Sequence, residues 1–238
     1  MKNEGGDTVI MTAQPLQKPK GFIDTISEIQ QVASMEGRGA VLPENFFTIK
    51  NRLDFFTVGL KGAFISGLIT AMMTPFAIGV IEKKIPVFGT YTPNTFDKVF
   101  VFILALSYAI GYGIFIGSAG RYSNGVISRA MIRNFLGGVI SGATFKMIIA
   151  FVFFHFVYFF VITDSVLGKI FGFLYKTGLN RQHLNSFWNW IFTFKPVFLT
   201  SAWFVVITTL VFLAVPVFFF VKSLLRREKT LFTEMRGG

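Results

Sequence analysis

Four apolar stretches dominate the pattern of hydrophobic and polar positions along this chain of 238 residues. They cover about residues 62–81, 99–118, 136–162 and 197–221. At about 1.5 Å of rise per helical residue, each stretch is long enough to cross about 30 Å of hydrocarbon. The pattern therefore predicts an all-α integral membrane protein with four transmembrane helices.

The residues before the first span show the spacing of amphipathic helices. From Phe22 to Val32 an apolar residue recurs every three or four positions, which predicts a short helix that ends near Gly37. The same spacing over 43–56 predicts a second helix, lying in the membrane interface before the first span. Residues 1–55 are accordingly expected to form a cytoplasmic N-terminal segment.

The long connection between the third and fourth spans carries a similar pattern. Thr163 suits the cap of a helix in which apolar residues recur up to Leu174. The segment 186–196 follows, and its Trp188 and Trp190 suit the boundary between lipid headgroups and hydrocarbon. Two short interfacial helices are therefore expected between these spans.

Charge adds an orientation to this topology. The chain holds 23 Lys and Arg against 12 Asp and Glu, a formal net charge of +11. Ten of the cations flank the spans on the side that holds both termini: Lys50, Arg52, Arg121, Arg129, Arg133, Lys222, Arg226, Arg227, Lys229 and Arg236. Seven flank them on the opposite side: Lys83, Lys84, Lys98, Lys169, Lys176, Arg181 and Lys195.

Because cytoplasmic loops are enriched in Lys and Arg, this asymmetry places both termini in the cytoplasm. The protein is expected in the cell inner (plasma) membrane, with its transmembrane domain over 56–222. Residues 223–238 are expected to form a basic cytoplasmic tail.

Composition narrows the chemistry that the chain can supply. With no Cys and two His, it can build neither a disulfide, a Cys-ligated zinc or iron–sulfur centre, nor a multi-His metal site. No G-x-S-x-G motif or carboxylate pair suggests hydrolysis. We therefore expect no cofactor, no metal and no enzymatic activity. A basic multi-span chain is typical of proteins that bind anionic lipid headgroups, and nucleic acid is not an expected partner.

Small residues on the spans are the first candidate for function. Six glycines are expected at helix-packing positions: Gly62, Gly67, Gly113, Gly117, Gly138 and Gly142. Small side chains let helices approach closely in lipid. Two interpretations are open at this point, namely packing among the spans of this chain and docking onto helices of other chains.

Two ionisable residues fall inside the third span. A lysine at depth, such as Lys146, costs about 2.5–3.5 kcal/mol on insertion scales. It is expected either to contact an anionic substrate or a partner's carboxylate, or to extend toward the interface. His155 lies among aromatic residues and is either functional or a neutral packing residue. No Asp or Glu falls inside a predicted span, which disfavours a cation-coupled carrier and leaves an anion pathway open, with Lys61 and Lys146 as its cations.

Basic residues also gather beside the spans on the predicted cytoplasmic side. This patch consists of Arg121, Arg129, Arg133, Arg226 and Arg227. It is expected to contact anionic lipid headgroups or, alternatively, to dock an acidic cytoplasmic partner.

Two functions are compatible with these observations. The first is a non-catalytic inner-membrane subunit that acts as a scaffold or assembly component of a multiprotein complex. In architecture the chain is similar to small basic multi-span subunits of bacterial secretion and conjugation machines. Its partners would be other membrane-protein subunits or further copies of itself. The alternative is an oligomeric transporter or channel for an anionic or lipid-like solute, acting through Lys146.

Overall fold

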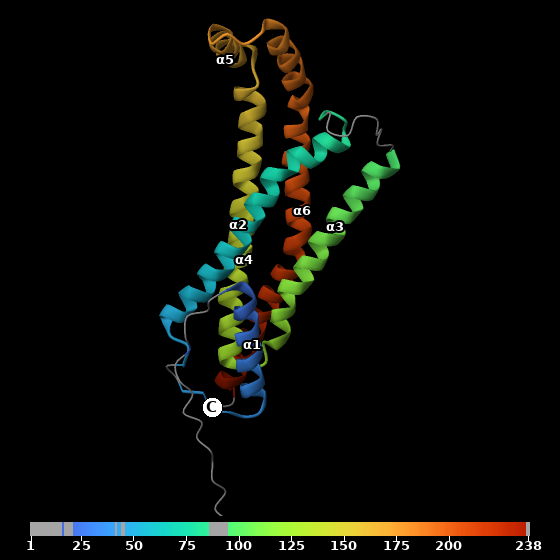
Figure 1. The fold of residues 1–238 in the computed structure, drawn as a ribbon. Helices are drawn as coiled ribbons and strands as arrows, with labels where there is room; N and C mark the ends of the chain where they lie inside the picture. Colours follow the sequence, from blue (N-terminus) through green and yellow to red (C-terminus); the bar gives the residue numbers. More distant parts are fainter. Residues whose placement is uncertain (1–15, 17–20, 41, 44–45, 86–94, 237–238) are drawn as a thin grey trace, which may run out of the picture.

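Four long helices form the body of the protein (Figure 1). The computed structural model describes residues 16, 21–40, 42–43, 46–85 and 95–236, the last ten by their backbone alone. The long helices are α2 (Ile49–Ile81), α3 (Thr95–Gly117), α4 (Val126–Phe156) and α6 (Arg181–Arg236). Each is long and apolar enough to cross a membrane. The prediction of an all-α, multi-pass membrane protein with four spans is confirmed.

The first amphipathic helix is also confirmed, as α1 (Phe22–Gly37). Its apolar face, formed by Ile26, Ile29 and Val32, is buried in the same hydrophobic cluster as Phe135 of α4. α1 packs on α4, on α2 and on the short helix η2 (Ser118–Tyr122) that follows α3. Figure 1 shows it alongside one end of the bundle. The N-terminal helix is thus part of the core.

The second helix expected before the first span, over 43–56, is not a separate element. α2 begins at Ile49, where the Thr48 hydroxyl accepts a hydrogen bond from the Asn51 amide, and it continues unbroken to Ile81. Polar side chains in its first turns do not interrupt it, because a helix satisfies its backbone hydrogen bonds internally. This part of the prediction was wrong in its boundary.

Between the third and fourth spans the structure has one separate short helix instead of the two expected. α5 (Asp164–Lys176) is capped by the hydroxyl of Thr163 as predicted, and it lies across the end of the bundle (Figure 1). A π-helical turn, η3 (Val157–Val161), leads into it from α4. The second expected helix, over 186–196, is instead the first part of α6, which runs without a break from Arg181 through the fourth span.

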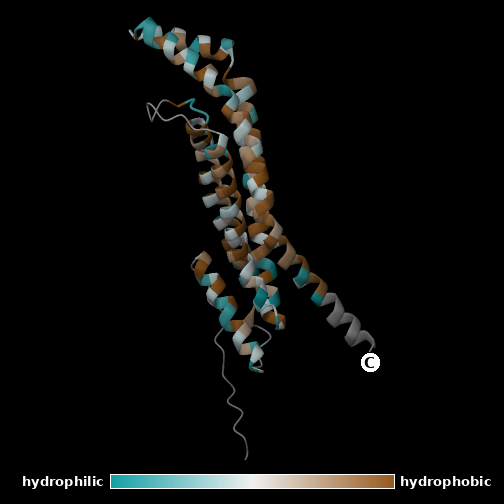
Figure 2. Cartoon of the chain, turned by 90° about the vertical axis from the view of Figure 1, so that its right-hand side faces the viewer, coloured by the Kyte–Doolittle hydropathy of each residue, from teal (hydrophilic) through white to brown (hydrophobic). Residues whose placement is uncertain are grey.

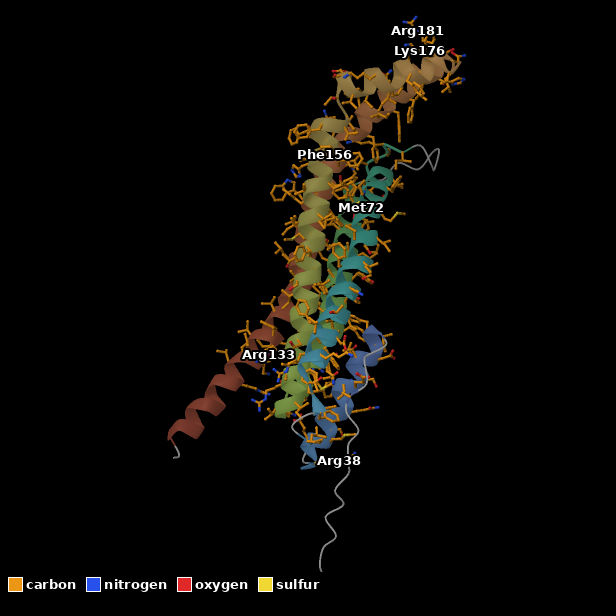
Figure 3. All side chains as sticks on the ribbon, turned by 90° about the vertical axis from the view of Figure 1, so that its left-hand side faces the viewer. Arg38, Met72, Arg133, Phe156, Lys176 and Arg181 are labelled. Carbon is orange, nitrogen blue, oxygen red and sulfur yellow. The ribbon has the colours of Figure 1, made fainter. Side chains whose placement is uncertain are left out.

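α6 bends along its length. It contains Pro196 and Pro216, and an internal proline removes a backbone hydrogen bond and clashes with the preceding turn. Figures 2 and 3 show α6 changing direction toward both of its ends. At its beginning, Leu184 packs against Leu167 and Phe171 of α5, so these two helices form a small hydrophobic cluster of their own.

α4 is the central helix of the bundle. It packs on α2 and α6, and α3 packs on α6, whereas α2 and α3 make almost no contact although they are consecutive in sequence. Phe55, Phe135 and Leu136 are fully buried between these helices. Figure 2 shows hydrophobic residues along the spans and hydrophilic residues gathered toward the two ends.

The two ends of the bundle carry different charged residues. Figure 3 shows Arg38 and Arg133 at one end and Lys176 and Arg181 at the other, with Met72 between them. The C-terminal part of α6 returns to the end where α1 lies (Figure 1), as an even number of spans requires.

Candidate intramembrane binding site

A cleft of about 780 Å³ lies between α2 and α3. It arises because these two helices pack on α4 and α6 and only slightly on each other, and because small residues such as Ala63, Ala105 and Ala143 line it. Apart from Lys146, its polar residues all carry hydroxyl groups: Ser66, Thr70, Thr74, Ser107, Tyr108, Tyr112, Thr208 and Thr209. The cleft is therefore polar in places, although it lies between membrane-spanning helices.

Lys146 of α4 extends into this cleft. Its ammonium nitrogen Nζ donates a hydrogen bond to Thr209 Oγ1 of α6 over 2.6 Å. Its aliphatic stem crosses Gly67 of α2, where an added Cβ would stand 3.3 Å from Lys146 Cγ and Cδ. The ammonium group thus lies inside the bundle, and the expected contact with an anionic substrate or a partner's carboxylate stays a prediction.

The hydroxyls of α2 form a row along the cleft. Ser66, Thr70 and Thr74 are spaced four residues apart, so they lie on one face of the helix. Each donates its proton to the carbonyl four residues earlier, over 2.5, 2.9 and 3.1 Å respectively. These residues were not predicted as part of a site, although a Ser or Thr at every fourth position of an apolar span is visible in the sequence.

The electrostatics of the cleft favour an anion. Within the described part of the chain, Lys146 is the only Lys, Arg, His, Asp or Glu that lines it. One of the three ammonium N–H groups is bound by Thr209, and the other two have no protein acceptor among the described residues. Positive charge without a counterion in surroundings of low polarity attracts an anion strongly.

The six glycines expected at packing positions all face other parts of this chain. Gly138 and Gly142 of α4 lie directly against the backbone of Phe56 and Leu60 in α2, where an added Cβ would overlap the carbonyl oxygens. These contacts explain how α2 and α4 approach closely along their length.

The remaining packing glycines behave in the same way. A Cβ on Gly113 would stand 2.6 Å from the carbonyl oxygen of Phe212, and one on Gly117 would stand 2.5 Å from Val215 Cγ1, both in α6. A Cβ on Gly62 would stand 2.6 Å from Phe22 Cδ2 of α1. The structure thus uses these positions for packing within the chain.

His155 takes no part in the cleft. Its Nδ1 is hydrogen-bonded to the carbonyl oxygen of Phe151 over 2.8 Å, one turn earlier in the same helix. The two rings also pack together, with centroids 4.1 Å apart. The environment is that of a packing residue, and the structure does not bring it to Lys146.

The basic linker between α3 and α4 meets an acidic group of this same chain. The Glu36 carboxylate of α1 accepts hydrogen bonds from the Ile127 and Ser128 amides, over 2.8 and 3.0 Å. Negative charge is favourable there, because the first turn of a helix exposes unpaired N–H groups. Arg129 donates from Nε to the carbonyl oxygen of Gly125 over 2.9 Å. The Glu36 carboxylate of α1 therefore binds the N-terminal turn of α4.

The other members of the basic patch lie around this point. Arg226 of α6 places Nη1 3.5 Å from the carbonyl oxygen and the hydroxyl of Ser123. Figure 3 shows Arg133 at the same end of the bundle. Arg121 is exposed, and the side chain of Arg227 lies outside the described residues. The end of α6 and the linker thus meet on the side of the molecule that holds α1.

Neither a metal centre nor a similar protein adds a function to this description. In the described ranges, no three His, Asp or Glu side chains are grouped closely enough to hold a metal ion. The chain matches no protein-family model, no curated protein sequence and no solved structure. The fold and the site define a four-span membrane protein with a cation-bearing cleft inside its bundle, and its function is argued from that cleft.

Proposed function

We propose that this protein binds an anionic, lipid-like solute in the cleft and transports it across the membrane. The observation that carries the proposal is the position of Lys146 in the cleft. Among the described residues, two of its ammonium N–H groups have no acceptor and no carboxylate lines the site. A phosphate or carboxylate would supply the missing counterion through charge-assisted hydrogen bonds.

The walls of the cleft support a solute with an apolar chain. Val101 and Leu104 of α3 and Phe204 of α6 line it beside the polar groups. In this proposal a lipid enters sideways between α2 and α3, which pack little on each other, and its chain stays in the membrane. One chain supplies every group described, so this mechanism does not depend on self-association.

The test is transport by the purified protein in vesicles that contain an anionic lipid with a fluorescent acyl chain. An impermeant quencher measures how fast this lipid crosses the bilayer. Lys146→Met is expected to lower the rate about tenfold or more, the loss that removal of a charge-assisted hydrogen bond produces. The control is Lys61→Met, since Lys61 is exposed on α2 and does not line the cleft. Equal rates for the unaltered protein and Lys146→Met would overturn the proposal.

A second candidate function is the assembly subunit expected from the sequence. The observation that favours it is the same lack of contact between α2 and α3, which leaves room for a helix from another chain. A carboxylate on that helix would pair with Lys146. The packing glycines do not support this candidate, because they face helices of their own chain.

Purification in mild detergent, followed by mass spectrometry, separates the two candidates. A second membrane protein that co-elutes at a fixed ratio, and is lost with Lys146→Met, would support the assembly subunit. A single chain that carries only lipid would contradict it.

A further inference from the structure

Five of the eight hydroxyl groups that line the cleft donate their protons to carbonyl oxygens of their own helices. Ser66, Thr70 and Thr74 donate to α2 carbonyls, as described above. On α6, Thr208 Oγ1 donates to the Phe204 carbonyl over 2.8 Å, and Thr209 Oγ1 donates to the Val205 carbonyl over 2.6 Å. A hydroxyl has one proton, so each of these five groups can only accept a further hydrogen bond.

Thr209 demonstrates this arrangement within the protein. Its oxygen donates to its own helix and accepts the hydrogen bond from the Lys146 ammonium. Beside the hydroxyls of Ser107, Tyr108 and Tyr112, the cleft therefore presents two kinds of group to a ligand, one cationic donor and five neutral oxygens that can only accept. A ligand that satisfies both needs one negative charge and additional hydrogen-bond donors of its own.

We propose that the solute is an anionic lipid whose headgroup carries hydroxyl groups beside a single negative charge. This inference rests on the proposed function and specifies its substrate. The charged oxygens of the headgroup bind the free N–H groups of Lys146. The headgroup hydroxyls donate to oxygens that can only accept, first among them Thr70 Oγ1 on α2.

Charge decides between a hydroxyl and an ammonium as the additional donor. No Asp or Glu lines the cleft in the described part of the chain, so an ammonium group of the ligand would lie near Lys146 without a counterion. Like charges in surroundings of low polarity repel strongly. Neutral hydroxyls meet the same acceptors without this cost, so an amine-bearing zwitterionic headgroup is expected to bind poorly.

The experiment compares two lipids that differ only in headgroup hydroxyls. Phosphatidylglycerol and phosphatidylmethanol with identical acyl chains have the same phosphodiester charge, but only the first carries donors. Their affinities are measured by native mass spectrometry of the purified full-length protein. Phosphatidylglycerol is expected to bind about fivefold more tightly, the effect of one or two neutral hydrogen bonds. Equal affinities would overturn the inference.

Substitution of an acceptor provides the matched control. Thr70→Val keeps the shape of the side chain and removes the oxygen, so it is expected to abolish the preference for phosphatidylglycerol over phosphatidylmethanol. Thr57→Val is the control, because Thr57 makes the same bond to its own helix, over 2.7 Å to the Leu53 carbonyl, outside the cleft. A preference that survives in Thr70→Val would contradict the inference.

The outcomes distinguish this inference from the function on which it rests. If both lipids bind equally and both are lost with Lys146→Met, the anion site stands and the role of the hydroxyls is wrong. If neither lipid binds, both fail. Glycerophosphoglycerol, the same headgroup without acyl chains, is expected to compete poorly. Effective competition by it would overturn the assignment to a lipid.

Discussion

At the scale of single residues, the charge of Glu28 in α1 conflicts with its surroundings. Its carboxylate oxygen Oε2 is buried and has no hydrogen-bond partner among the described residues. Burial disfavours the charged form, and the neighbouring negative charge of Asp24 adds to the effect, so the pKa of Glu28 is raised above its ordinary value of 4.5. The Glu28 carboxyl therefore binds a proton more readily when α1 is packed on the bundle than when the chain is unfolded.

This shift predicts how stability depends on pH. Because the folded-state pKa is the raised one, the stabilisation from protonation is present below 4.5 and is lost as the pH rises through the folded-state pKa. Glu28→Gln is expected to raise the thermal midpoint in detergent at neutral pH, and the difference should shrink in acid. Glu82→Gln is the control, since it breaks a partly exposed pair with Lys84 and should give no gain. A lower midpoint for Glu28→Gln at neutral pH would contradict this account.

At the scale of helices, the contact between α2 and α4 depends on backbone touching backbone. Gly138 leaves no room for a side chain beside Phe56, whereas nothing lies within 4 Å of the position that a Cβ on Gly111 would occupy. Two glycines in the same kind of apolar helix therefore have different roles. Their difference cannot be read from composition, because glycine is common in membrane helices.

The pair gives a direct prediction. Gly138→Ala is expected to destabilise the isolated chain by about 1–3 kcal/mol, the usual range for overpacking, because the backbones of α2 and α4 must move apart. Gly111→Ala is expected to be neutral or slightly stabilising, since alanine favours the helix. Thermal unfolding of the purified chain measures both. A Gly138→Ala protein of unchanged midpoint but altered complex size would instead show that this glycine packs against another subunit.

At the scale of the whole molecule, the charged residues at the two ends of the bundle predict its orientation in the membrane. α1, the basic linker and the end of α6 lie together, opposite α5 (Figure 1). The chain contains no cysteine, so a single introduced cysteine reports one position without background. Arg38 and Lys176 are suitable because they lie at opposite ends of the bundle (Figure 3).

Labelling with an impermeant maleimide tests the orientation in intact cells. Lys176→Cys is expected to react from outside, and Arg38→Cys only after the membrane is permeabilised, because the positive flanks favour cytoplasmic termini. Both variants should react in detergent, which controls for accessibility. The reverse pattern would invert the orientation, and labelling of both from one side would contradict the arrangement of four spans.

The sequence by itself determined the local features of this protein. The four spans, the amphipathic helix α1 and the Thr163 cap of α5 were predictable, because bilayer length, helical periodicity and capping depend on residues close together in the chain. Helix boundaries were less so. The pattern of polar residues suggested breaks after residues 56 and 196, but a helix continues through polar positions unless its backbone is interrupted.

Only the tertiary structure decided what the cleft contains. Lys146 and Thr209 are 63 positions apart, and Ser66 comes from a third helix, so no local pattern could place them in one site. The same holds for Glu36 and the first turn of α4, and for the helix that each glycine faces. Such contacts depend on which faces of the helices meet, and this is settled by close packing across the whole bundle.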